Sequence, residues 1–194
     1  MKEVFAILGA VVVLFCTVPY ILDIVKQKTR PNIVTWIIWT LLIGIGAAAL
    51  FANHDYNAAW LLVGDAIATF AVVIVGLKYG TAKLDRFDFI CFVGAIVGVI
   101  LWLVFDSPII AIIATLLIDL VGTIPTIRHA YRHPEEETSL TFALGVVATT
   151  FTLLSLSGYG FSAWIYPAYL FCSNGLLFMI IFLGQRYDHQ TAKK

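Results

Sequence analysis

Three polar side chains interrupt long apolar stretches of this sequence. Asp65 stands in LLVGDAIATF, Asp119 in LLIDLVG and Asn174 in FCSNGLLF. An ionisable group in hydrocarbon costs about 2.5–3.5 kcal/mol on insertion scales, so such residues commonly mark a binding site or an ion pathway. A carboxyl group there can bind a cation or carry a proton. We expect all three residues to converge on one central cavity; the alternative is a structural hydrogen bond to a neighbouring helix.

The composition indicates that lipid surrounds the elements carrying these residues. The chain has 194 residues, of which 61% are hydrophobic and 12% charged, whereas a globular protein has about 25% charged residues. A stretch of about 20 apolar residues crosses a bilayer core. Seven such stretches cover approximately residues 4–25, 33–52, 57–78, 87–105, 109–128, 139–156 and 163–185. The predicted fold class is therefore all-α and integral to a membrane, with seven transmembrane helices.

The basic residues predict the orientation of the chain, because cytoplasmic loops retain Lys and Arg. Of the 12 Lys and Arg residues, only Lys2 lies on the side of the amino terminus. The others follow the first, third, fifth and seventh stretches: Lys26, Lys28, Arg30, Lys78, Lys83, Arg86, Arg128, Arg132, Arg186, Lys193 and Lys194. This asymmetry requires an odd number of spans, with the amino terminus outside and the carboxyl terminus in the cytoplasm. Short loops favour a prokaryotic plasma membrane.

The two halves of the chain resemble each other, and such internal similarity indicates a repeat. The segment TVPYILDIVKQKTRPNIVTW (17–36) aligns with TIPTIRHAYRHPEEETSLTF (123–142) at an offset of 106 residues, and GLKYG (76–80) echoes GQRYD (184–188). We predict a three-helix repeat over residues 1–80, a linker helix over 81–106 and a second repeat over 107–194. Under this alignment Asp65 corresponds to either Ser173 or Asn174.

With this repeat and helix order, the chain resembles the PQ-loop and SWEET superfamily of small solute transporters, over almost the whole sequence. Its members join two parallel three-helix repeats through an inverting helix. The resemblance implies that an Asn on the third helix of each repeat binds the solute. Asn174 matches that position, and Asp65 would replace its twin. Proton coupling in similar proteins would suit Asp65 and Asp119.

The resemblance also assigns roles to prolines near the cytoplasmic side. Pro19 and Pro125 match the hinge proline on the first helix of each repeat, although Tyr20 and Thr126 stand where the family usually has Gln. Membrane helices also tolerate proline without a hinge function. The aromatic residues Trp36, Trp39 and Phe142 have two interpretations: an aromatic belt at the membrane surface or an inner gate.

The expected function is a small-solute transporter that works by alternating access, with proton coupling left open. The alternative is a non-transporting receptor or assembly factor of the same architecture. Sugar-transporting members carry a Trp on the second helix of each repeat, whereas Ala49 or Leu50 and Gly158 or Tyr159 stand here. The resemblance therefore does not extend to a named solute. A monomer contains both repeats and suffices for a pathway, and an oligomer is compatible with it.

Other classes of function fit the sequence poorly. The formal net charge is zero, so no basic surface for nucleic acid is predicted. HExxH and GxSxG motifs are absent, which argues against an enzyme with those sites. A retinal-type photoreceptor needs a lysine inside its seventh helix, and none is present there. His129 and His133, followed by Glu135–Glu137, suggest a solvated loop rather than a metal site, and no cofactor is expected.

Overall fold

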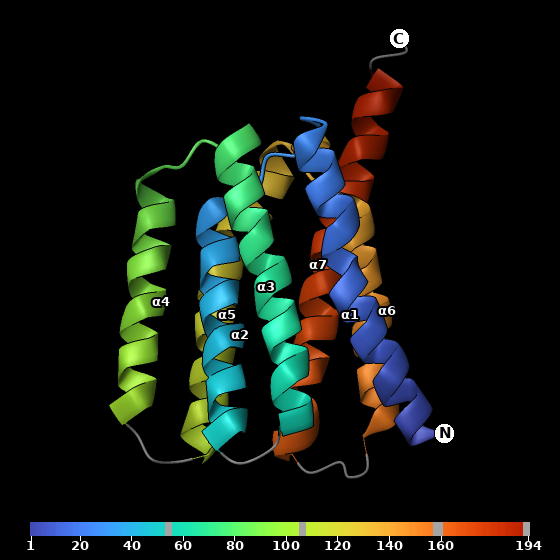
Figure 1. The fold of residues 1–194 in the computed structure, drawn as a ribbon. Helices are drawn as coiled ribbons and strands as arrows, with labels where there is room; N and C mark the ends of the chain where they lie inside the picture. Colours follow the sequence, from blue (N-terminus) through green and yellow to red (C-terminus); the bar gives the residue numbers. More distant parts are fainter. Residues whose placement is uncertain (53–55, 105–107, 157–160, 192–194) are drawn as a thin grey trace. The chain divides into compact units, whose positions relative to one another are not determined.

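The computed structural model describes residues 1–52, 56–104, 108–156 and 161–191, and these form an all-helical protein (Figure 1). Within the described residues there are seven α-helices and one short 3-10 helix. They are α1 (Lys2–Val25), α2 (Ile33–Ala52), α3 (Tyr56–Tyr79), α4 (Arg86–Val104), α5 (Pro108–Arg132), η1 (Pro134–Glu136), α6 (Ser139–Ser155) and α7 (Phe161–Thr191). The all-α prediction is confirmed, and each predicted apolar stretch coincides with a helix.

Four of the described helical segments are long and apolar enough to cross a membrane. They are Lys2–Val25, Leu62–Tyr79, Ile113–Arg132 and Trp164–Tyr187, and two shorter apolar segments are Ile33–Ala48 and Ser139–Ser155. Helices suit such a sequence because lipid offers no hydrogen bonds, so each backbone group must be satisfied within its own segment. Large apolar side chains such as Phe15, Ile67 and Phe89 point outward, as expected of a surface that meets lipid. These helices are compatible with a membrane protein.

The contacts within the chain divide it into two compact units. Unit 1 comprises Met1–Arg30 and Ile127–Lys194, and unit 2 comprises Pro31–Thr126. In unit 1, α1 packs along α6, α6 packs along α7, and η1 contacts α7 (Figure 1). In unit 2, α2 contacts both α3 and α4. The chain passes between the units next to Pro31 and Pro125, so the last turns of α5 belong to unit 1.

The core of unit 2 is built where α2 meets α4 and α5. It contains Val34, Ile38 and Leu42 of α2, Ala95 of α4 and Ile118 of α5. Gly122 allows α5 to approach α2, because a Cβ there would lie 2.6 Å from Ile38 Cγ2. Membrane helices use small residues in this way, since lipid supplies little hydrophobic drive for helix association.

The core of unit 1 uses the same device between α1 and α6. A Cβ on Gly9 would lie 3.3 Å from both the carbonyl oxygen of Ala148 and the hydroxyl of Thr152. The rings of Phe5 and Phe151 stack nearby, with centroids 6.1 Å apart. The threonines of α6 stay satisfied by bonding their own helix; for example, the Thr152 hydroxyl donates to the Ala148 carbonyl at 3.1 Å, which lets a polar side chain lie in an apolar helix.

The start of α4 is fixed by a reciprocal cap. The Asp85 carboxylate accepts hydrogen bonds from the backbone N–H groups of Phe87 and Asp88, and the Asp88 carboxylate accepts one from the Asp85 N–H at 2.8 Å. This arrangement is a capping box. Asn32, which caps α2 by accepting from the Val34 N–H, also donates to Asp88 Oδ1 at 3.1 Å. The first turns of α2 and α4 are therefore tied together within unit 2.

Candidate functional site

Asp119 is the most deeply buried of the predicted site residues, with an exposed fraction of 3%. It lies on α5 in unit 2, next to the core residue Ile118. One turn later, the Thr123 hydroxyl donates to the Asp119 carbonyl oxygen at 2.8 Å and lies 3.5 Å from its Oδ2. The longer distance is beyond the usual range for an O–H donor. The carboxyl group of Asp119 is thus held in the interior of unit 2, as expected for a residue of functional or structural weight in a membrane helix.

Asp65 lies half-buried on α3, in the same unit. The Thr69 hydroxyl, one turn away, lies 3.0 Å from the Asp65 carbonyl oxygen. The Thr40 hydroxyl of α2 lies 3.1 Å from that of Thr69. A pair of hydroxyl groups therefore joins α2 to α3 one turn from the Asp65 carboxyl group, which makes this part of the α2–α3 contact polar.

Asn174 and Ser173 lie half-buried on α7 in unit 1. The Asn174 amide nitrogen donates to the Leu170 carbonyl of its own helix at 2.8 Å. The carboxamide lies against Gly145 of α6, so closely that a Cβ at Gly145 would overlap it. Asn174 thus occupies the contact between α6 and α7, where the missing side chain of Gly145 makes room for it.

The predicted binding residues fall into both contact units. Asp65 and Asp119 belong to unit 2, whereas Ser173 and Asn174 belong to unit 1. Their convergence on one cavity stays a prediction. The correspondence of Asp65 with Ser173 or Asn174 also stays open.

Both predicted hinge prolines lie inside continuous helices. Pro19 is within α1 and Pro125 is within α5. Proline lacks the N–H that would bond the carbonyl four residues earlier, which weakens the helix at that point. Beside Pro125, the Thr35 hydroxyl of α2 donates to the Gly122 carbonyl at 2.6 Å, so a neighbouring helix supports the backbone there. Sequence analysis did not single out Pro167, which also lies inside a helix, α7.

The three aromatic residues of the predicted gate lie at the starts of α2 and α6. Trp36 and Phe142 are each 2% exposed, which argues against a lipid-facing belt for these two residues. Trp36 packs edge-on against Trp39, with centroids 5.1 Å apart. Phe142 packs edge-on against Tyr20 of α1 at 6.3 Å. The gate role stays a prediction, and the rings are packed as helix-to-helix contacts within each unit.

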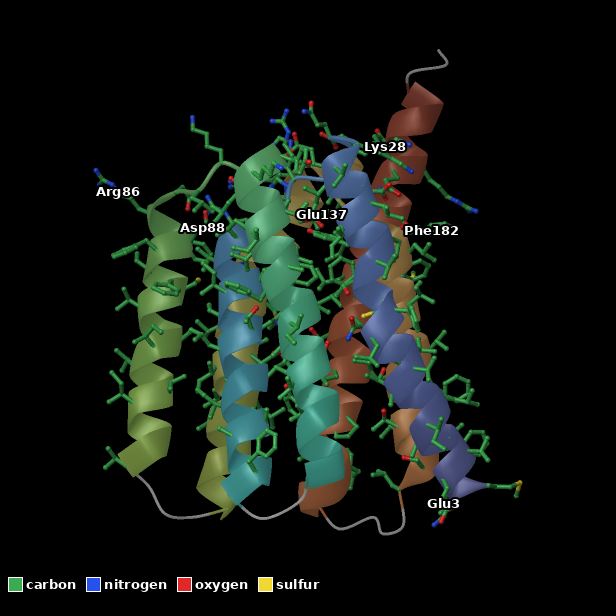
Figure 2. All side chains as sticks on the ribbon, in the orientation of Figure 1. Glu3, Lys28, Arg86, Asp88, Glu137 and Phe182 are labelled. Atoms are coloured by element: carbon green, nitrogen blue, oxygen red, sulfur yellow. The ribbon has the colours of Figure 1, made fainter. Side chains whose placement is uncertain are left out.

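A cluster that sequence analysis missed is centred on Glu137, which immediately follows η1. Its side chain is 2% exposed and that of Tyr20 is fully buried. The Tyr20 hydroxyl donates to Glu137 Oε2 at 2.7 Å, across 117 residues of sequence. The amide of Gln185 on α7 donates to the backbone carbonyls of Pro134 and Glu137 at 2.9 and 2.8 Å. Glu137 therefore joins α1, α6 and α7 at one end of unit 1 (Figure 2).

A chain of hydroxyl groups extends this cluster towards α1. The Thr138 hydroxyl donates to Asp23 Oδ2 at 3.0 Å and lies 2.6 Å from the Thr29 hydroxyl. Since Thr138 uses its hydrogen towards Asp23, Thr29 is the donor to Thr138. The backbone N–H of Arg30 also donates to the Glu136 carbonyl at 2.8 Å. The loop after α1 and the loop before α6 are thus held together by side-chain and backbone bonds.

Burial raises the pKa of Glu137 from 4.5 to about 8; the Tyr20 hydrogen bond opposes this shift and the nearby Glu136 charge adds to it. Glu136 has cationic partners, since Arg30 Nε lies 3.6 Å and His129 Nε2 3.4 Å from its carboxylate. The expectation of a solvated loop is wrong for Glu137, because the fold places this residue under Tyr20. The sequence offers no local signal for this burial, since an acidic run beside histidines resembles a solvated loop.

Within the described residues, no group of three His, Cys, Asp or Glu side chains is placed to hold a metal ion. Comparison of the chain with family models, with curated proteins and with solved structures gives no match. The contacts within the chain must therefore support any functional proposal.

Proposed function

We propose that this protein is a membrane carrier for a small polar solute. It is built from two like-facing three-helix repeats joined by α4 and works by alternating access, exposing one site first to one side of the membrane and then to the other. Repeats related by an axis along the membrane normal are one of the recurrent designs of such carriers.

The observation that carries this proposal is one contact that occurs once in each unit. In unit 2, Gly76 of α3 lies against Pro31 before α2, and a Cβ on Gly76 would be 2.8 Å from the Pro31 ring. In unit 1, Gly184 of α7 lies against Pro134 before α6, where a Cβ would be 2.6 Å from the ring. Gly76 and Gly184 are aligned by the sequence echo GLKYG and GQRYD. A glycine-on-proline contact at matched places supports a common origin for the two helix sets.

The helix boundaries and packing partners support the same correspondence. α5 begins 106 residues after α1, and α6 begins 106 residues after α2, which is the offset of the sequence alignment. The packing of α2 on α3 is matched by that of α6 on α7. The approach of α1 to α6 at Gly9 is matched by that of α5 to α2 at Gly122. Only α4 has no counterpart among the described helices, as a linker helix would not.

The solute site is proposed at the polar residues of the third helices, with Asp65 from the first repeat and Ser173 and Asn174 from the second. Asp119 adds a buried carboxyl group on α5. Carboxyl groups in a membrane helix suit a proton or a cationic solute, so proton coupling is part of the proposal. We propose a plasma-membrane location with the amino terminus outside.

Uptake into proteoliposomes tests the function. Purified wild-type protein is compared with Asp65→Asn and with the exposed control Glu3→Gln, using radiolabelled glucose, alanine, arginine and thiamine with and without a pH gradient. We expect one solute to accumulate with the wild type and the control, and the gradient to stimulate uptake less in Asp65→Asn. Saturable binding without uptake would favour the receptor alternative, and neither binding nor uptake of any probe would contradict a carrier for these solute classes.

A further inference from the structure

We propose that the Glu137 carboxyl group is a proton-binding site, and that loss of its proton opens the junction that joins α1, α6 and α7 in unit 1. Proton binding stands on the geometry of this junction alone, whereas a link between the opening and solute movement rests on the proposed carrier function.

The first argument is the incomplete bonding of the Glu137 carboxyl group. Oε2 accepts a hydrogen bond from Tyr20, but Oε1 is buried and has no hydrogen-bond partner among the described residues. A carboxylate removed from water needs several donors or a paired cation to balance its lost hydration. With a single donor, the neutral acid fits this position better than the anion does. The raised pKa of Glu137 agrees with this geometry.

The second argument concerns the charges that face the carboxyl group. Groups from every packed element are, on α1, Tyr20 and Asp23; after α1, Arg30; on α5, His129; on η1, Glu136; and on α7, Gln185 and Arg186. Arg30 and His129 both point to Glu136, Asp23 is reached only through Thr138, and the Arg186 guanidinium lies 4.3 Å above the Phe182 ring. Each described cation therefore faces another group, so none of them compensates a negative charge on Glu137.

The third argument is the position of the junction. Tyr20 directly follows Pro19, where α1 lacks one backbone hydrogen bond, so α1 can bend next to the Glu137 contact. Gln185 holds the loop that carries Glu137 to α7. When the O–H bond of Glu137 breaks, the proton passes to water and both bonding electrons remain on the carboxylate. The buried anion then gains hydration if Tyr20 and the loop separate, and this gain drives the opening.

Infrared titration of the purified protein in detergent tests proton binding directly, without any solute. We expect the wild type to show a carboxylic-acid C=O band that disappears with a midpoint near pH 8. The band should be missing from Glu137→Gln and retained in Glu135→Gln, a control two residues away whose side chain is about half exposed. A band that titrates identically in wild type and Glu137→Gln would overturn the proposal.

A second variant covers the case in which Glu137→Gln does not fold. Tyr20→Phe removes a hydrogen bond that favours the ionised carboxylate, so the midpoint of the Glu137 band should move to higher pH. An unchanged midpoint in Tyr20→Phe would contradict the geometry on which the proposal rests.

Hydrogen exchange tests the opening. After correction for the intrinsic pH dependence of exchange, the Arg30 amide, which bonds the Glu136 carbonyl, should lose protection through the same pH range in wild type. It should keep that protection in Glu137→Gln, which mimics the neutral acid. A titrating band with unchanged Arg30 protection would overturn the opening. If the band and the protection both change while no solute is taken up, the proton site stands and the carrier function fails.

Discussion

The close approach of Gly145 to Asn174 gives a prediction for a single methyl group. A Cβ added at Gly145 overlaps the Asn174 carboxamide, so Gly145→Ala must rotate that side chain or separate α6 from α7. Overpacking of this kind typically costs about 1–3 kcal/mol. We expect a lower thermal unfolding midpoint in detergent for Gly145→Ala. Combining it with Asn174→Ala should recover most of the loss, because the overlapping atoms are then removed.

Gly44→Ala is the matched control for this variant, since a Cβ at Gly44 meets no atom within 4 Å. Alanine has a higher helix propensity than glycine by about 1 kcal/mol, so Gly44→Ala should unfold at an equal or higher temperature. Equal unfolding midpoints for Gly145→Ala and Gly44→Ala would contradict the contact between Gly145 and Asn174.

Glu137 gives a prediction for stability against pH. Its pKa rises from 4.5 to about 8 on folding, so between these values the folded state holds a proton that the unfolded state has released. The free energy of unfolding contributed by this group must therefore fall as the pH rises from 4.5 to about 8, and stay level above that. Chemical unfolding in detergent across this range should show a smaller decline for Glu137→Gln than for Glu135→Gln. A decline of equal slope in both variants would contradict the shifted pKa.

Residue types within helices could be anticipated from sequence, but the burial of a loop residue could not. Asp119 was expected inside the protein because the surrounding apolar residues leave no aqueous surface for it. Glu137 was expected in solvent, since its neighbours in sequence are polar. Its burial depends on Tyr20, 117 residues away, and no pattern within the loop encodes a partner at that distance.

At the scale of elements, the junction between α2 and α4 depends on one carboxylate. Asp88 accepts from the backbone of Asp85 and from the side chain of Asn32, so Asp88→Ala removes part of a capping box and leaves a buried amide without this acceptor. Loss of a cap costs about 0.5–2 kcal/mol and an unsatisfied buried group about 1–3 kcal/mol. We expect lower stability in Asp88→Ala and faster hydrogen exchange in the first turn of α4.

Asp88→Asn is the conservative counterpart of this variant. Its amide oxygen can still accept from Asn32, so it should lose less stability than Asp88→Ala does. If the two variants were equally destabilised, the contact with Asn32 would contribute nothing, and the capping interactions alone would explain the loss.

The existence of the helices followed from apolar length, whereas their ends did not. α7 was expected over about residues 163–185 but extends to Thr191. Beyond the apolar stretch, Gln185 bonds the η1 loop and Arg186 covers the Phe182 ring. These contacts support the helix past the point where hydrophobicity ends. Hydropathy reports only the part of a helix that lipid or a core surrounds, so the extension had no signal in the apolar pattern.

At the scale of the whole molecule, sequence similarity and packing group the helices differently. The alignment at an offset of 106 residues pairs α1 with α5 and α2 with α6, but α1 packs along α6 and shares unit 1 with α7. Similarity between segments indicates a shared origin, whereas packing partners are selected by complementary surfaces such as Gly9 on Ala148. A repeat read from sequence therefore predicts which helices are equivalent and leaves their partners open.

The distribution of basic residues predicts the topology, which single-cysteine labelling in intact cells can measure. In a background without Cys16, Cys91 and Cys172, cysteine is introduced at Glu3, Arg86 or Tyr187, three exposed positions. An odd number of spans with basic loops inside predicts that a membrane-impermeant maleimide labels Glu3→Cys only, and labels the other two after the cells are opened. Labelling of Glu3→Cys and Tyr187→Cys from the same side would require an even number of spans. That outcome would remove the like-facing repeats on which the carrier depends, because a single linker helix between them would then fail to restore their common orientation.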